Sequence, residues 1–478
     1  MASRLVALTP RPKLLVLVVL EQIRPDHLED AWSQFGPNGL RRIFDKGAYF
    51  PDCRHLASTF TATSIVTLAT GAWPAQHGIV ADSWYDRTAR RAVSANEEAL
   101  EATTLSEQVP DSGHHVFVVA MNRTHAALAA GTPEAHLYWM DDRGQFTTNG
   151  EGTDWLTPFN QQHQPDAQRG AKWMAPNPRP DTPPLRTLIY NQERPLEFMA
   201  LYRSSPFAMQ AVFELAMEVI AREGLGQGAN TDLVIILPGS SALLGYEVGG
   251  LSPLMPQMAL ALDRRIEALL GLLDHAPGEN KYNLVLAGGH GAPPEPYAEA
   301  RPRMAVKGEV LAQAIQKRLL SRNSVKVEKY LYPFLYLDAS YLDTSGVRDL
   351  EPARVAAGRA ALEQAPVAGY YTSGGSCSTH NEWERRFRNS FHLKRSGDLM
   401  LSYRPEYIED FDAGRGVSYG SLYNYDVRVP LCFFGPQFRA GVFESPVESV
   451  DVAPTLARAL GVETPSSSTG RVLGEAFA

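Results

Sequence analysis

Short apolar runs that alternate with longer stretches of helical periodicity constrain the fold of this chain more than any other feature. Between the runs, apolar residues recur at helical spacing over residues 208–222 and 258–273. This alternation predicts an α/β fold in which a mainly parallel sheet is sandwiched by helices. Sites in such folds lie beyond the carboxyl ends of the strands, so the residues after each run are the candidates for chemistry. The runs occupy residues 14–20, 116–120, 233–237, 284–287 and 431–434.

The domain organisation follows from length and local composition. A chain of 478 residues can form one large domain with insertions, or two to three smaller domains. We predict a single α/β domain over residues 1–478. Residues 142–195 are rich in Pro, Gly, Gln and Asn and indicate an inserted cap, and residues 295–375 indicate a second insertion.

Charge and cysteine content narrow the function classes. The net charge of −8, without a long basic run, argues against nucleic-acid binding, because phosphate neutralisation needs clustered Lys and Arg. The three cysteines, Cys53, Cys377 and Cys432, show no metal-binding spacing, which favours reduced thiols over a disulfide framework. The partner indicated is an unknown small molecule or protein, and the sequence leaves the oligomeric state open.

No segment reaches the roughly 18 apolar residues of a membrane span. The apolar run over residues 14–20 follows basic residues but is too short for a signal peptide and lacks a small-residue cleavage site. We therefore expect a cytoplasmic protein with no membrane span. A secreted or periplasmic location would require that a leader had been removed from the sequence.

His290 is the most informative single residue. It follows the apolar run 282–287 and lies between Gly289 and Gly291. A histidine between glycines at the end of a buried strand is typical of a metal ligand or a catalytic base. Gly289 leaves no carboxylate beside it, although the rest of the chain predicts one.

An ordered set of motifs carries a family resemblance along nearly the whole chain. It resembles the alkaline phosphatase superfamily, and in particular the type I phosphodiesterase/nucleotide pyrophosphatase branch with its single-threonine alkaline phosphatases. The resemblance implies an alkaline-phosphatase-like α/β fold with inserted cap elements. The motifs lie at residues 21–26, 61–71, 73–79, 83–86, 137–141, 418–430 and 450–456.

In this family two zinc ions clamp the phosphoryl oxygens and activate a Thr or Ser nucleophile. The resemblance places Thr61 at the nucleophile, His290 at a retained histidine ligand and Glu21 at the first-strand carboxylate. Other zinc-ligand positions are occupied by residues that bind zinc poorly. These are Ala242, Tyr246, Gly289 and Tyr419. The resemblance thus implies zinc as the family cofactor, while the residues predict none in this chain, with Glu21 and His290 as the residual metal-ligand candidates.

The substrate-side positions have changed as well. Asp82 stands where the family has an Asn that holds a phosphoryl oxygen, and Asn122 and Thr124 stand where it has a Lys-x-Arg pair. Phosphoryl transfer relies on cationic donors, so these residues are unsuited to binding a dianionic phosphate. We take four residues as candidate binding residues: Asp82, Asn122, Tyr246 and Tyr419.

Three function hypotheses follow. The first is a degenerate phosphodiesterase-family protein without a competent two-zinc site, a pseudoenzyme that binds a ligand or partner in the former active-site cleft. The second is a metal-independent enzyme of the ester or acyl-transfer type, with Thr61 as nucleophile, His290 as base and Glu21 orienting the imidazole. The third is an atypical metal-dependent phosphate-ester hydrolase, which rests on fold analogy alone.

Overall fold

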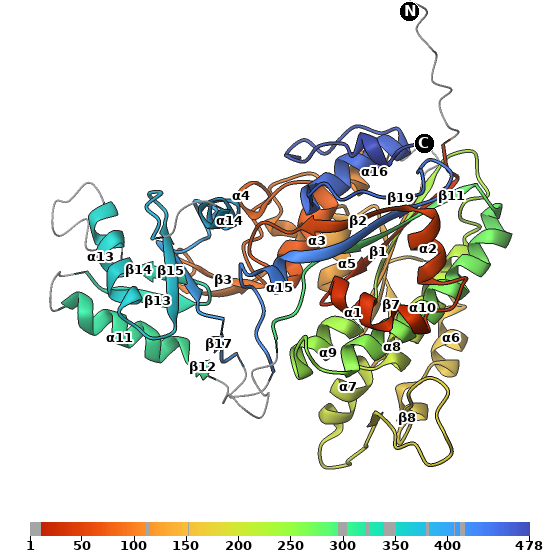
Figure 1. Cartoon of the computed structure of the whole chain (residues 1–478), viewed down its shortest axis with the longest axis horizontal. Helices are drawn as coiled ribbons and strands as arrows, with labels where there is room; N and C mark the ends of the chain where they lie inside the picture. The colour runs from red at the N-terminus through yellow and green to blue at the C-terminus, as the bar shows by residue number, and fades with distance from the viewer. Residues whose placement is uncertain are drawn as a thin grey trace, which may run out of the picture.

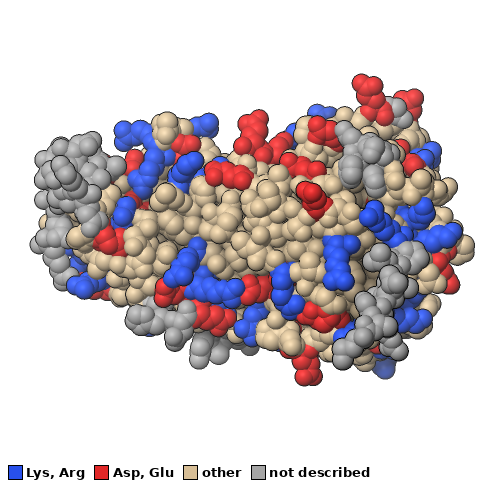
Figure 2. Space-filling view, turned by 90° about the horizontal axis from the view of Figure 1, so that it is seen from above, with Lys and Arg blue, Asp and Glu red and all other residues tan. Residues whose placement is uncertain are grey.

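The structure is a computed structural model. It describes residues 11–109, 115–151, 153–294, 304–320, 325–338, 350–378, 382–405, 407–411 and 416–478. Within these ranges, no helix combines the length and the apolar character that crossing a bilayer requires. On the face in Figure 2, acidic and basic side chains are intermixed over the surface.

A ten-stranded sheet forms the centre of the molecule (Figure 1). Its middle strand, β1 (Leu14–Leu20), pairs in parallel with β10 (Asp232–Leu237) on one side and β11 (Tyr282–Gly288) on the other. Beyond β10, the parallel strands β5 (Val116–Ala120) and β6 (His136–Met140) continue the sheet. The prediction of a mainly parallel α/β sheet is therefore confirmed.

The other side of the sheet is antiparallel. There β18 (Arg428–Phe434) lies between β11 and β2 (Ala48–Arg54) and runs against both. The short strands β19 (Gly441–Val442) and β20 (Val447–Glu448) pair with β2, and β7 (Phe146–Thr148) closes the opposite end of the sheet. The apolar run at 431–434 was thus correctly predicted as a strand, and it runs against the parallel strands, as β7 does at the other end of the sheet.

Helices cover both faces because the side chains of β1 alternate between two apolar clusters. Val16 and Val18 belong to the cluster that contains buried residues of α8 (Pro206–Arg222) and α10 (Leu254–Leu273). Leu15 and Leu17 belong to the cluster with α3 (Thr61–Thr70), α5 (Arg123–Ala130) and α16 (Val452–Leu460). A strand that is buried on both faces reads as a continuous apolar run, which is how it was recognised in the sequence.

A smaller, antiparallel four-stranded sheet lies beside the large one, at the left in Figure 1. Its order is β13 (Val327–Leu331), β14 (Phe334–Leu337), β16 (Leu399–Tyr403) and β15 (Val367–Thr372). It packs with α11 (Gly308–Leu320) and α13 (Glu351–Leu362) around its own apolar cluster. The boundaries of the insertions at 142–195 and 295–375 stay predictions.

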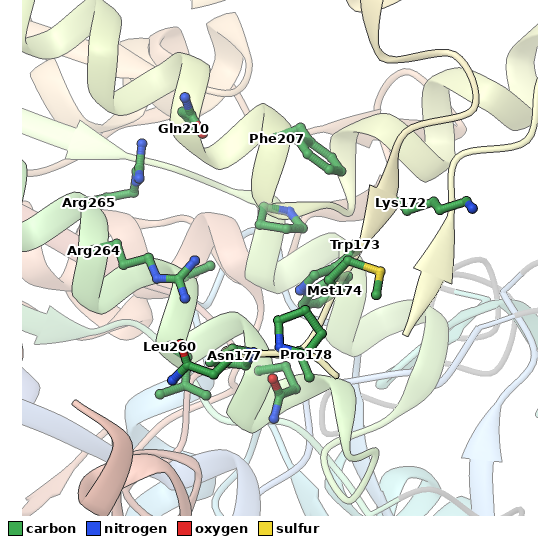
Figure 3. A pocket seen from close by; sticks show the side chains of 15 residues that line it. Lys172, Trp173, Met174, Asn177, Pro178, Phe207, Gln210, Leu260, Arg264 and Arg265 are labelled. Atoms are coloured by element: carbon green, nitrogen blue, oxygen red, sulfur yellow. The ribbon is translucent and has the colours of Figure 1, made fainter. Parts of the chain in front are cut away.

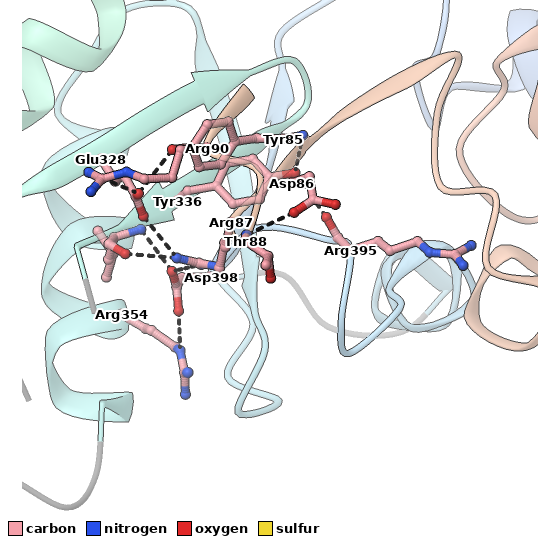
Figure 4. Close-up of polar contacts among 11 residues, drawn as sticks. Tyr85, Asp86, Arg87, Thr88, Arg90, Glu328, Tyr336, Arg354, Arg395 and Asp398 are labelled. Atoms are coloured by element: carbon pink, nitrogen blue, oxygen red, sulfur yellow. Dashed lines mark hydrogen bonds and ion pairs between the residues drawn. The ribbon is translucent and has the colours of Figure 1, made fainter. Parts of the chain in front are cut away.

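An ion-pair network joins the small sheet to the segment that follows β3 (Ser83–Asp86), as Figure 4 shows. The carboxylate of Asp398 accepts hydrogen bonds from Arg87 and from Nε of Arg354, the latter at 3.1 Å. Glu328 accepts from the hydroxyl of Tyr85 at 3.0 Å and from Arg87 at 3.3 Å. Since Asp82 directly precedes β3, this network anchors one side of the candidate site.

The remaining elements connect these layers. The helices are α1 (Pro25–Ala31), α2 (Leu40–Lys46), α4 (Pro74–His77), α6 (Leu156–Gln162), α7 (Pro195–Arg203), α9 (Ser240–Val248), α14 (Glu382–Ser390) and α15 (Asn424–Val427). The short strands are β4 (Arg91–Ser94), β8 (Lys172–Trp173), β9 (Arg186–Thr187), β12 (Met304–Val306) and β17 (Tyr407–Glu409).

Candidate functional site

The candidate site lies where β1, β11 and α3 meet. Glu21 follows the last residue of β1, and His290 follows β11 two residues after its last strand residue, Gly288. Leu20 and Gly288 are paired in register, so the two strands end at the same edge. Thr61 is the first residue of α3. The structure therefore brings the three predicted catalytic residues to one edge of the sheet, all of them less than 5% exposed.

Thr61 and His290 are hydrogen-bonded to each other. The distance from Thr61 Oγ1 to His290 Nε2 is 3.0 Å, and His290 Nδ1 lies 2.8 Å from the carbonyl oxygen of Gly291. A carbonyl oxygen only accepts, so the proton is assigned to Nδ1, and Nε2 accepts from the Thr61 hydroxyl. Burial lowers the pKa of His290 to about 4, which keeps the imidazole neutral at physiological pH. The pair has the geometry of a nucleophile and its base.

The expected contact between Glu21 and His290 is wrong. Both ring nitrogens of His290 have other partners, and the carbonyl of Gly291 holds the imidazole instead. Glu21 is buried, and its Oε1 has no hydrogen-bond partner among the described residues. Burial, and then the charge of Asp82, raise the pKa of Glu21 well above its ordinary value. Glu21 therefore favours the neutral, protonated form.

Asp82 lies at the N-terminus of α3. Its Oδ1 accepts a hydrogen bond from the backbone N–H of Ala62 at 2.9 Å, and its Oδ2 accepts from the hydroxyl of Tyr419 at 2.9 Å. Burial raises the pKa of Asp82, and these two hydrogen bonds act against that rise. The N-terminus of a helix attracts anions through its free N–H groups and its dipole. The chain's own carboxylate thus fills the anion position beside Thr61.

Tyr419 connects the polar residues to an aromatic wall. Its ring stacks on that of His290, with ring centroids 5.0 Å apart and an angle of 24° between the planes. Tyr246, from α9, contacts Tyr419 edge to face at 6.2 Å, and Phe60 does so at 6.0 Å. Both tyrosines are half-buried. The structure therefore places the two predicted tyrosines together, beside His290.

Asn122 has a local structural role. It is the N-cap of α5, where its Oδ1 accepts from the backbone N–H of His125 at 2.8 Å, and its Nδ2 lies 3.1 Å from His125 Nδ1. Such a cap stabilises a helix by about 1 kcal/mol. The neighbouring Arg123 is exposed and bonds to Glu97 at 3.0 Å. All the described hydrogen bonds of the Asn122 side chain are to His125. A role for Asn122 in ligand binding stays a prediction.

The residues at this edge do not fit a zinc ion. Structural and catalytic zinc sites need at least three converging Cys, His or carboxylate ligands, and the described residues contain no such group. The free lone pair of His290 is used by Thr61, and Glu21 favours its protonated form. A Cβ atom at Gly289 would lie 3.4 Å from Cγ of Glu21, so a carboxylate at that position would have faced Glu21 directly.

The sequence interpretation missed two features of the site. The carbonyl of Gly291 orients His290, and the hydroxyl of Ser241 donates to the carbonyl of Glu21 at 2.7 Å. Gln22 was also missed: it is fully buried with φ of 58°, and neither polar atom of its side chain has a partner among the described residues. Backbone acceptors leave no signal in a sequence, and the only signal for Gln22 was its place directly after a buried strand.

Comparisons with known proteins define the class to which this fold and site belong. Residues 15–413 match the model of the family described as type I phosphodiesterase / nucleotide pyrophosphatase. The chain belongs to this family, as its motifs implied.

Individual relatives align over nearly the full chain. The alkaline phosphatase PafA of Elizabethkingia meningoseptica is 24% identical over 98% of this chain and 94% of its own length. The alkaline phosphatase PhoV of Synechococcus elongatus is 24% identical over 97% of this chain and 92% of its own. The crystal structure of wild-type PafA superposes with a TM-score of 0.86 at 22% identity, covering 98% of this chain and 99% of that one. The predicted alkaline-phosphatase-like fold is thereby confirmed.

Proposed function

We propose that this chain is a degenerate member of its family, which hydrolyses phosphate esters weakly or not at all and binds a ligand or protein partner at the former active site. The observation that carries the proposal is the carboxylate of Asp82 at the N-terminus of α3. It accepts from the N–H of Ala62, next to Thr61. A substrate phosphate would have to displace an anion that is covalently part of the chain.

The charges around Thr61 support the same conclusion. In the described part of the chain, no Lys or Arg side chain bonds to Thr61, Asp82 or His290. Phosphoryl transfer depends on cations that neutralise the charge of the transition state. A phosphate dianion here would meet the carboxylate of Asp82, and repulsion between like charges in a low-dielectric site opposes its binding.

Steady-state turnover of aryl phosphates and phosphodiesters tests the proposal. The assays compare added zinc with chelator, and PafA serves as the active control. We expect background rates from the wild type under both conditions. Zinc-dependent turnover that is lost in Thr61→Ala would contradict the proposal. Asp82→Asn, which replaces the carboxylate with an uncharged side chain, should bind inorganic phosphate more tightly than the wild type, because the internal anion is gone.

The hydrogen bond between Thr61 and His290 favours one second candidate, a metal-free acyl transfer. Thr61 Oγ1 would attack an ester carbonyl while His290 Nε2 accepts the hydroxyl proton. The bond from the acyl carbon to the alcohol oxygen would break, the alcohol would leave with that proton, and water would then hydrolyse the acyl-threonine to the acid and free Thr61. Two features oppose it. A pKa of about 4 makes His290 a weak base. The N–H of Ala62, which could stabilise an oxyanion, is taken by Asp82.

Aryl-acetate hydrolysis in the presence of chelator distinguishes this candidate from a binding role. Acyl transfer predicts turnover that Thr61→Ala abolishes and Thr61→Ser retains. A binding protein predicts the same background rate in all three proteins. In that case ligands are sought by the rise in melting temperature that they cause, with Tyr246→Ala as the variant in which the binding surface is altered.

A further inference from the structure

A pocket outside the candidate site lies between α8, α10 and the segment 172–178 (Figure 3). Its volume is about 330 Å³, at the lower end of the range for small-molecule sites. It shares no lining residue with the site around Thr61, so its function does not depend on the one proposed above. The lining residues used in the argument are Trp173, Phe207, Gln210, Gln257, Arg264 and Arg265.

Positive charge predominates at one wall of this pocket. Arg264 is exposed, and within the described ranges no carboxylate forms an ion pair with it. The neighbouring Arg265 is 3.8 Å from Glu214, whose carboxylate is already bound by His163 at 2.8 Å and by Gln210 at 2.7 Å. Arg265 therefore shares the carboxylate of Glu214 with His163 and Gln210. An anionic ligand would complete the charge balance, and Arg is the side chain best suited to carboxylate and phosphate.

The remaining walls provide apolar rings and an unused acceptor. Trp173 and Phe207 come from β8 and the start of α8, and Figure 3 shows Arg264 reaching from α10 into the space that these residues border. Planar ligands stack favourably on such rings. Oε1 of Gln257 is buried and has no hydrogen-bond partner among the described residues, so it can accept from a ligand. Charge and rings together select a small organic anion with a planar ring.

We propose that this pocket binds a small aromatic anion, with the carboxylate or phosphonate group on Arg264 and Arg265 and the ring between Trp173 and Phe207. The pocket volume of about 330 Å³ accommodates a substituted ring. Carboxylate and phosphonate share the chemistry that the guanidinium groups recognise, and the experiment below separates them.

Ligand-observed NMR titrations of the full chain test the proposal, with benzoate and phenylphosphonate as probes and benzamide as the neutral ring control. We expect at least one of the two anions to bind the wild type and benzamide to bind at least tenfold more weakly. Arg264→Gln should weaken binding by about tenfold, the loss expected for a hydrogen bond to a charged group. Ala261→Phe, which fills the pocket, should abolish it.

Arg91→Gln is the matched control, because Arg91 is an exposed arginine on β4 that does not line the pocket. It should leave the affinity unchanged, as should Thr61→Ala. Three results would each overturn the proposal: neither anion binds the wild type, Arg264→Gln binds as tightly as Arg91→Gln, or Thr61→Ala abolishes binding. The last result would place the probe at the former active site, whereas loss of binding in Arg264→Gln alone leaves the proposed function untouched.

Discussion

The two halves of the candidate site differ in their burial and in the contacts that hold them in place. The polar half, Glu21, Thr61 and His290, is buried at the ends of β1 and β11 and keeps the hydrogen bond at 3.0 Å between Thr61 and His290. The aromatic half, Tyr246 and Tyr419, is half-buried and contacts its neighbours mainly through rings. Where the family resemblance implies zinc ligands, one half is a buried polar cluster and the other is an aromatic wall.

The difference shows how the buried polar groups of the candidate site find partners among its aromatic residues. A buried polar group costs roughly 1–3 kcal/mol unless it finds a partner. Tyr419 supplies such partners, because it stacks on His290 and donates to Asp82. Glu21 is the exception, since its Oε1 has no partner among the described residues and its pKa is raised.

The largest effect on stability is expected in the polar half. His290→Ala removes the acceptor of the Thr61 hydroxyl and the ring beneath Tyr419, and should lower the free energy of unfolding by roughly 2–4 kcal/mol. Tyr246→Ala truncates a larger but half-exposed side chain and should lower it by less. Urea denaturation of both variants checks the difference. If Tyr246→Ala were the more damaging change, the polar half would not be the stabilising one.

Glu21→Gln tests the unpaired carboxyl. A carboxyl whose folded pKa is raised binds its proton more tightly in the native state, so its contribution favours folding below the ordinary pKa of 4.5 and is lost as the pH rises through the folded value. The wild type should therefore lose stability between pH 5 and pH 8, and Glu21→Gln should lose less. At pH 8 the variant should be more stable by roughly 1–3 kcal/mol.

Denaturation of wild type and variant at several pH values measures this effect. Parallel stability curves would mean that Glu21 has an ordinary pKa or a partner that holds its charge. Asp426, whose pKa burial raises to about 7, contributes a similar loss with pH, so the variant should reduce the slope and not remove it.

A smaller effect is expected from the contact between the two halves. Tyr419→Phe keeps the ring on His290 but removes the hydroxyl that donates to Asp82, and should lower the free energy of unfolding by about 1 kcal/mol. Tyr371→Phe is the matched control, since Tyr371 is also buried but no hydrogen bond of its hydroxyl is described. Equal effects of the two variants would show that the bond to Asp82 contributes nothing net.

Much of the fold was predictable because β1 and β5 are buried on both faces and read as uninterrupted apolar runs. Residues 14–20 and 116–120 match these strands in full. By contrast, β2 was missed, since its burial alternates along Ala48–Arg54 and its sequence contains Pro51 and Asp52. The antiparallel direction of β18 was not predictable either, because an apolar run carries no information about strand direction.

The candidate site was predictable at the level of its residues and not of its contacts. Motif order brought Thr61 and His290 together correctly, and the structure joins them. The orienting group was predicted as Glu21 and is the backbone carbonyl of Gly291, which every residue type could provide. Asp82 was likewise predicted to be a binding residue, but its position at the start of α3 could be known only from the fold. The sequence indicated which side chains could take part in chemistry, but it did not indicate which backbone groups would contact them.

The zinc content of the purified protein tests the central claim most directly. The chain is equilibrated with zinc, dialysed, and measured by mass spectrometry of the metal beside PafA and His290→Ala. We predict zinc far below one ion per chain in the wild type and no further loss in His290→Ala, because His290 and Glu21 do not form a ligand set. Near-stoichiometric zinc that disappears in His290→Ala would contradict it.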